Sequence, residues 1–233
     1  MKLDKSIAVL AMVASLILAT TAVAAQDNQP TQSSVSDVDT LDQYFAESDD
    51  EVEVYGGNVT QANLDSEQST DNWAGIYGNA SGNLVLGAGE EGDVLFDWDA
   101  SADYVFASSD DVVWSNITNG TAETVNDFYG LEVEDSDSAE DTFNAEDNAT
   151  VDVAREEYEG DTALTNGEED EEWSTVVLED NSSDTVTTNV PVFSGIVGEG
   201  DSAFNGDEAD YQMILPAEDD TEPRSFDMYL ELS

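Results

Sequence analysis

The stretch DVLFDWDASADYVFASSDDVVW, residues 93–114, is the part of the sequence that decides the fold class. It contains three short apolar groups, at 94–98, 104–106 and 112–114, which are separated by Asp, Ser and Ala residues. Val, Phe, Tyr and Trp dominate these groups, and such residues favour strands. Short apolar groups that follow one another at this spacing are typical of an all-β protein. The segment therefore predicts consecutive strands.

The same pattern continues on both sides of this segment. Short apolar groups recur from about residue 51 onward, and the last one, 226–232, alternates with a period of two. Asn-Gly pairs, which favour tight hairpin turns, occur at 119–120, 166–167 and 205–206. We therefore predict a β-sandwich or jelly-roll-like domain over residues 51–233, with a division into two β units near 136–148 as an alternative. The best candidate for a helix is 138–158, although its apolar period is irregular.

The first 25 residues have the layout of a secretory signal peptide. A short basic start precedes an apolar stretch, 7–18, and small residues at 22–24 stand just before Gln26. Two alternatives stay open, a retained membrane anchor and a pilin-type leader that is cleaved near Ser6. Because all three export the rest of the chain, we expect an extracellular or cell-surface location.

Residues 26–50 follow this leader and are rich in Gln, Ser and Asp. Such a composition buries too little apolar surface to offset the entropy of ordering the chain. We therefore predict a disordered, flexible acidic stem between the leader and the folded domain.

The charge of the chain excludes several function classes. Against 55 Asp and Glu there are only 4 Lys and Arg, which gives a formal charge of −51, and His and Cys are absent. Once the leader is removed, Arg155 and Arg224 are the remaining cations. This composition argues against nucleic-acid binding, disulfides, His-based catalysis and His or Cys metal sites. We therefore predict a protein that is not an enzyme.

The acidic residues also indicate the solvent in which the protein works. They are spread along the chain, and the apolar content of 39% is ordinary for a folded domain. At ~1 M salt the screening length is only about 3 Å, so surface carboxylates scarcely repel one another. The sequence therefore predicts a fold adapted to concentrated salt, in which most acidic clusters are solvated surface.

One acidic group is the nearest candidate for a cation site. Asp201, Asn205, Asp207 and Asp210 place oxygen ligands around a turn in the segment DSAFNGDEAD. Calcium is the ion that such ligands suit, but the spacing does not match a calcium-binding loop of the EF-hand type. Apart from this calcium candidate, the sequence predicts no cofactor.

The sequence contains six N-x-[ST] sequons, more than chance predicts for its content of Asn, Ser and Thr. They begin at Asn58, Asn79, Asn116, Asn119, Asn148 and Asn181. In an exported protein these are acceptors for N-glycans. We therefore predict glycosylation at these sites, with turn formation by Asn as the alternative.

Aromatic and acidic side chains leave a carbohydrate-directed function open. The four tryptophans, Trp73, Trp98, Trp114 and Trp173, either pack in the core or form a platform on which sugars stack. Pairs of carboxylates such as Asp97/Asp99 and Glu132/Glu134 have the spacing of one strand face and could act on glycosides. Pairs of this kind arise inevitably in so acidic a chain, so they have little specificity.

Two segments resemble a known group of proteins. Residues 72–82, NWAGIYGNASG, resemble a W-x-G-x-[YF]-G-N-x-[ST]-G signature, and 210–216, DYQMILP, with the closing YLEL at 229–232, resembles the end of the same proteins. These are uncharacterised secreted surface proteins of archaea, halophiles among them. The resemblance implies an exported β-rich archaeal protein and transfers no catalytic residue.

Together these features predict an exported, salt-adapted, N-glycosylated and non-catalytic protein of the cell surface or the medium, with a structural or interaction role. The expected partners are cell-envelope components or other copies of the chain, and a membrane only if the leader is retained. One alternative is a carbohydrate-binding or carboxylate-dependent glycan-active protein of the envelope. Another is a filament subunit joined by strand exchange, for which Val52 and Val54 or the last strand could serve.

Overall fold

The computed structural model describes residues 29–36, 38–41, 53, 56–59, 61, 67–88, 93–166, 172–182, 189–198, 200–217 and 223–233. The predicted leader, 1–25, lies outside the described residues, as do Val52 and Val54. Within the part of the chain that is described, no helix has both the length and the apolar character needed to span a bilayer.

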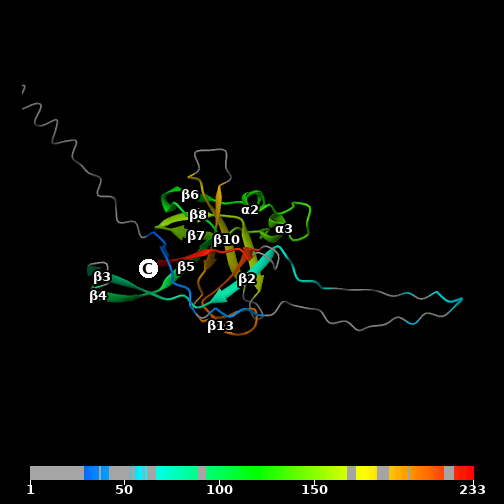
Figure 1. Cartoon of the computed structure of the whole chain (residues 1–233), viewed down its shortest axis with the longest axis horizontal. Coiled ribbons are helices and arrows are strands. Elements are labelled where there is room, and N and C mark those ends of the chain that lie inside the picture. The colour runs from blue at the N-terminus through cyan, green and yellow to red at the C-terminus, as the bar shows by residue number, and fades with distance from the viewer. Residues whose placement is uncertain are drawn as a thin grey trace, which may run out of the picture.

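A seven-stranded antiparallel sheet forms the centre of the molecule (Figure 1). Its strands are β1 (Thr31–Gln32), β5 (Ala102–Ser108), β6 (Ile117–Asn119), β9 (Thr162–Asn166), β10 (Glu172–Asp180), β11 (Val190–Ile196) and β15 (Asp227–Leu232). The order across the sheet is β1–β15–β5–β11–β10–β6, and β9 also pairs with β10. Strands from both sides of residues 136–148 belong to this one sheet, so these residues do not divide it.

Four two-stranded sheets accompany the main sheet. They are β2 (Trp73–Gly78) with β14 (Tyr211–Pro216), β3 (Gly82–Ala88) with β4 (Asp93–Ala100), β7 (Thr150–Val153) with β8 (Glu156–Glu159), and β12 (Asp201–Ser202) with β13 (Glu208–Ala209). The all-β prediction is therefore confirmed. The layers are unequal, because one large sheet is covered by short ribbons and helices.

Both faces of the main sheet are buried at its centre, since alternate residues of β5, β10, β11 and β15 enter different cores. Val105 and Phe193 belong to one core, with residues of α2 (Ala122–Tyr129), α3 (Ala139–Thr142), β2 and β14. Phe106 and Val192 belong to the other, with Val151 of the β7–β8 hairpin. Trp114, in the short 3-10 helix η1 (Trp114–Asn116), packs edge-on against Phe106 in this second core.

The helices differ from the sequence prediction. Of the predicted helix 138–158, only α3 is helical, and the β7–β8 hairpin occupies its end. The unpredicted helix α2 forms because both of its ends are capped: the Thr121 hydroxyl accepts a hydrogen bond from the Thr124 N–H at 3.3 Å, and Gly130 adopts φ +73°. The turn at 119–120, predicted as a hairpin, instead leads from β6 into this helix.

Part of the segment predicted as a flexible stem is ordered. Thr31 and Gln32 pair with Leu230 and Tyr229 of β15, and the Ser33 N–H donates to the Met228 carbonyl at 2.8 Å. Backbone pairing accounts for this order where composition predicts none, because an open strand edge binds almost any extended segment. The last strand, β15, is therefore paired on both sides, and strand exchange through it would first require β1 to leave.

The two segments that carry the resemblance to archaeal surface proteins form one ribbon. β2 and β14 pair over their whole length, from Trp73 opposite Pro216 to Gly78 opposite Tyr211. The loop after β2 is held by Asp210, whose carboxylate accepts a hydrogen bond from the Ala80 N–H at 2.9 Å. The residues of this signature therefore have a structural role, because they form the β2–β14 ribbon and the loop after β2.

Candidate functional site

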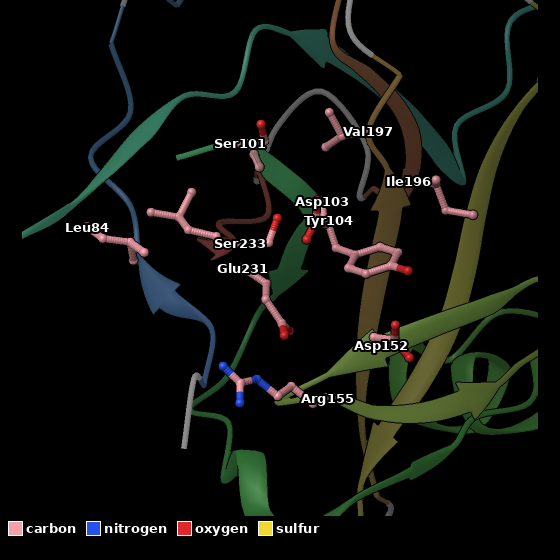
Figure 2. Close-up of a pocket in the computed structure, with 12 residues that line it drawn as sticks. Leu84, Ser101, Asp103, Tyr104, Asp152, Arg155, Ile196, Val197, Glu231 and Ser233 are labelled. Carbon is pink, nitrogen blue, oxygen red and sulfur yellow. The ribbon is translucent and has the colours of Figure 1, made fainter. Parts of the chain in front are cut away.

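A cavity of about 830 Å³ opens where the end of the main sheet meets the turn of the β7–β8 hairpin. Figure 2 shows Tyr104 and Glu231 on the sheet side, with Asp152 and Arg155 of the hairpin across from them. Tyr104 and Glu231 are register partners on the adjacent strands β5 and β15, so their side chains lie side by side on one face. Asp103, Ser101 and Ser233 also contribute to the polar lining.

The hairpin turn at this cavity has a strained backbone. Ala154 and Arg155 have φ values of 53° and 71°, and they connect Val153 to its strand partner Glu156. Two-residue turns of this kind favour Asn-Gly, because a residue with a Cβ in the left-handed region costs about 1–2 kcal/mol. The turn places Arg155 at the edge of the cavity, where its exposed side chain extends toward Glu231 (Figure 2).

Glu231 forms a hydrogen bond with the backbone of this turn. Its buried carboxylate accepts a hydrogen bond from the Ala154 N–H at 3.2 Å. Burial raises the pKa of Glu231, and the nearby carboxylates of Asp152 and Asp103 raise it further, while the backbone N–H groups of Ala154 and Arg155 lower it. The cavity thus contains a carboxyl group that is more easily protonated than an ordinary Glu.

Tyr104 experiences the same surroundings. Loss of solvent raises the pKa of its hydroxyl, as do the charges of Asp152, Asp103 and Glu231, whereas a hydrogen bond from the Asp152 backbone lowers it. Its hydroxyl therefore stays protonated at neutral pH and can both donate and accept hydrogen bonds. A tyrosine, three acidic side chains and one guanidinium can bind a ligand that has several hydroxyl groups.

A second exposed feature lies beside the cavity. The hairpin of β3 and β4, here called the arm, projects from the main sheet (Figure 1). At its base Gly82 lies so close to Leu232 of β15 that a Cβ atom would meet the leucine side chain. Leu84, near this base, also lines the cavity.

One face of the arm is apolar and open to solvent. Leu84 pairs with Trp98 and Leu86 with Phe96, and the four side chains are 45%, 49%, 52% and 55% exposed in that order. The Phe96 and Trp98 rings are in contact, with centroids 4.8 Å apart. The opposite face carries Asn83, Val85, Asp97 and Asp99. The predicted carboxylate pair Asp97/Asp99 therefore lies on the outer face of the arm. Val94 and Leu95, beside the register shift at Leu86/Gly87, are also exposed, at 53% and 79%.

The other predicted carboxylate pair is not on a strand. Glu132 and Glu134 lie in the turns that follow α2, where both are exposed. The two residues do not share a strand face, because Gly130 terminates α2 and residues 131–134 continue as a loop and turn.

The tryptophans divide between core and surface. Trp73 and Trp173 are buried, and their indole N–H groups donate to the carbonyls of Asp137 and Ser202, at 2.6 and 3.0 Å. Trp114 is half-buried against Tyr229, with ring centroids 5.1 Å apart. Only Trp98, on the arm, presents about half of its surface to solvent. A platform of four tryptophans for sugars is therefore not formed.

The predicted cation ligands do not converge on one point. The Asp210 carboxylate is occupied by backbone N–H groups of Ala80 and Gly200. The Asn205 amide donates to the Asp207 carboxylate at 2.7 Å in the turn between β12 and β13. Asp201 lies on β12, before this turn. Among the residues that the structure describes, no group of three or more acidic side chains is arranged to hold a metal ion.

All six sequon asparagines are exposed, as glycan attachment requires. Asn79 follows β2, and Asn116 ends η1. Asn181 lies beside Asn116, because its N–H donates to the Asn116 carbonyl at 3.1 Å, an adjacency that the sequence did not reveal. The Asn119 side chain is engaged by the fold, since its amide oxygen accepts a hydrogen bond from the Glu159 N–H at 3.2 Å.

Sequence reasoning missed the residues of the cavity. Glu231 alternates with Leu230 and Leu232 in a pattern that indicates a solvent-facing side chain, yet it is buried because both faces of the main sheet are covered. The one signal in the sequence that could have indicated this cavity is the scarcity of cations, since only Arg155 and Arg224 follow the predicted leader. Arg224 stacks over the Tyr129 ring, 4.5 Å from its centroid, so Arg155 is the basic residue of the described chain that faces a cavity.

Comparison with known proteins gave no match to a family model, to a curated protein or to a solved structure.

Proposed function

We propose that this chain is an exported, salt-adapted, non-catalytic protein of the cell surface or the surrounding medium, which acts by binding other molecules. The observation that supports this most is the apolar face of the arm. An acidic molecule in brine needs little exposed apolar surface, and a contiguous apolar patch on a soluble protein marks an interaction site. Its partners are components of the cell envelope or other copies of the chain.

The arm supplies a matched test of this function. Replacing Leu86 and Phe96 by Asn removes two apolar side chains from the exposed face, whereas Val85→Asn changes the opposite face of the same strand, where Val85 is 61% exposed. We expect the chain to co-sediment with haloarchaeal envelopes in multimolar salt, the double variant to lose this binding and Val85→Asn to keep it. Equal binding by all three would contradict the proposal.

Export is tested separately by fractionation of a haloarchaeal host that expresses the full chain. The mature protein should occur in the medium or the envelope fraction, with an N-terminus near Gln26. A retained apolar segment that begins near Ile7 would favour the pilin-type alternative. Recovery of the whole chain in the cytosol would refute export.

We further propose that the exposed sequons carry N-glycans. Intact mass of the exported protein should exceed the polypeptide mass by glycan increments. Asn79→Gln should remove one increment, because the Asn79 side chain is exposed in the loop after β2. Asn119→Gln should change the glycan mass less than Asn79→Gln does, because the hydrogen bond between the Asn119 side chain and the Glu159 N–H hinders modification after folding. An intact mass equal to that of the bare polypeptide would contradict glycosylation and would favour the alternative, in which these Asn residues only form turns.

The cavity favours a second candidate function, the recognition or processing of a carbohydrate. Its tyrosine, acidic and arginine side chains suit hydroxyl groups, and a carboxyl group of raised pKa is what acid-assisted glycosidic cleavage requires. Soluble oligosaccharides from the envelope should then bind in calorimetry, and Tyr104→Phe should weaken binding. If the protein also cleaves them, Glu231→Gln should abolish cleavage and retain binding. Failure of every envelope glycan to bind would exclude this candidate.

A further inference from the structure

We infer that the apolar face of the arm binds the same face of a second copy of this chain, so that the protein forms a dimer through two packed β3–β4 hairpins. The inference rests on the proposed binding function and names its partner. It also assigns the four side chains that make the contact: Leu84, Leu86, Phe96 and Trp98.

The arm lacks the support that a hairpin normally needs. In the described part of the chain it forms a sheet of two strands only, and it touches the main sheet at its base. A two-stranded sheet is at best marginally stable in water unless a further strand or layer packs on it. A second arm would supply that layer.

The charges on the arm are arranged for this packing. Asp97 and Asp99 lie on the face opposite to the four apolar side chains, so stacking two apolar faces leaves these carboxylates in solvent. None of the six sequons lies within β3 or β4, so glycans on these sites leave both strands unmodified. A partner that is itself acidic can pack on this face only through a surface without charge, because a carboxylate buried there would be unpaired. The apolar face of a second arm is such a surface.

The arm is also complementary to itself. Both leucines lie on β3, and both aromatic rings lie on β4. A two-fold axis parallel to the strands would place β3 of one copy over β4 of the other. Each leucine would then pack on an aromatic ring of the partner, in an isologous contact of the kind that most homodimers use.

The area of the apolar face limits the affinity that we expect for the dimer. Four side chains that are about half exposed offer roughly 400 Å² per copy, if a whole large side chain has about 200 Å². A standard stable interface buries about 800 Å² per partner. We therefore expect a weak dimer, with a dissociation constant in the micromolar range or above.

The test is sedimentation velocity of the full exported protein over a range of concentrations in multimolar KCl. The wild type should shift from monomer to dimer as its concentration rises. The Leu86→Asn/Phe96→Asn variant should associate at least about tenfold more weakly, and Val85→Asn should match the wild type. Near-UV circular dichroism identifies any variant that fails to fold.

Disulfide trapping gives a second readout, because the native chain has no Cys. Mixing a Leu86→Cys protein with a Phe96→Cys protein should give a mixed disulfide dimer more readily than Val85→Cys gives its own. A monomer at every concentration, or no preference among these cysteines, would overturn the inference.

The two proposals fail separately. A chain that remains monomeric, yet loses envelope binding in the Leu86→Asn/Phe96→Asn variant, would refute the dimer and retain the binding function with a different partner. A chain that dimerises through the arm without binding envelopes would establish self-association as its interaction.

Discussion

At the scale of single residues, one buried carboxylate, that of Glu231, connects the main sheet to the turn of the β7–β8 hairpin. Glu231 accepts a hydrogen bond from the strained turn at Ala154, and it lies beside Tyr104 at the wall of the cavity. Burial raises its pKa. The folded protein therefore binds a proton at this site more readily than the unfolded chain does. Ionisation of Glu231 consequently opposes folding as the pH rises.

Two substitutions separate the charge of Glu231 from its hydrogen bond. Glu231→Gln keeps an acceptor for the Ala154 N–H and removes the buried charge, so it should be at least as stable as the wild type at pH 7. Glu231→Ala removes the acceptor and should lower the free energy of unfolding by about 1–3 kcal/mol. Urea unfolding at constant multimolar KCl measures both.

The pH dependence has a definite sign. Below the ordinary Glu pKa of about 4.3 the group is protonated in both states and imposes no penalty. As the pH rises through the raised pKa of the folded state, the wild type should lose stability relative to Glu231→Gln. The matched control is Glu157→Gln, the same substitution at an exposed position of the β7–β8 hairpin. A constant difference between wild type and Glu231→Gln across this range would contradict the account.

At the scale of elements, close backbone contacts fix how the connections pack. Gly160, between β8 and β9, is buried, and a Cβ atom there would overlap the carbonyl oxygen of Val177 in β10. Gly130, after α2, has open space around it and a φ of 73°. One glycine is therefore required by contact and the other by backbone conformation.

These two causes predict different costs. Gly160→Ala should destabilise the protein by about 3 kcal/mol or more, because β10 is central to the sheet and cannot move away. Gly130→Ala should cost only about 1 kcal/mol, the usual penalty for a Cβ in the left-handed region. Thermal unfolding at fixed salt compares them. Similar costs for both variants would show that β10 yields to the added methyl group.

At the scale of the whole molecule, we expect the formal charge of −51 to control how stability depends on salt. Repulsion among the carboxylates grows as salt screening weakens, while a folded domain has only ~5–15 kcal/mol of net stability. Ion pairs give little relief. Of the two cations outside the predicted leader, Arg224 stacks on Tyr129 and Arg155 lies at the cavity.

We therefore expect folding to require salt. Dialysis from multimolar KCl to ~0.01 M salt lengthens the screening distance to about 30 Å, and near-UV and β-type circular dichroism should be lost cooperatively. Acidification towards pH 4 should partly restore both signals by neutralising carboxylates. A calcium titration is the control for specific cation binding, which would restore the fold at micromolar to millimolar ion. Retention of the fold in dilute EDTA buffer at pH 7 would contradict both explanations.

The sequence alone determined the class of the fold and the net charge of the chain. Apolar groups divided by turn residues predicted an all-β protein, and the groups at 104–106 and 226–232 became β5 and β15 of the main sheet. These properties are local, because strand patterning and turn preference act over a few residues. Net charge and the absence of His and Cys depend only on composition.

Tertiary structure alone decided which residues meet. Period-two patterning of the last strand predicted one buried face, but the β7–β8 hairpin covers the other face and buries Glu231. The apolar group at 94–98 predicted a strand, yet no layer of the described chain covers Trp98 and its neighbours on β3 and β4. Burial depends on what the rest of the chain places against a face, which a local pattern cannot specify. The cavity is therefore a product of long-range packing, and the exposure of the apolar arm follows from the absence of such packing on it in the described chain.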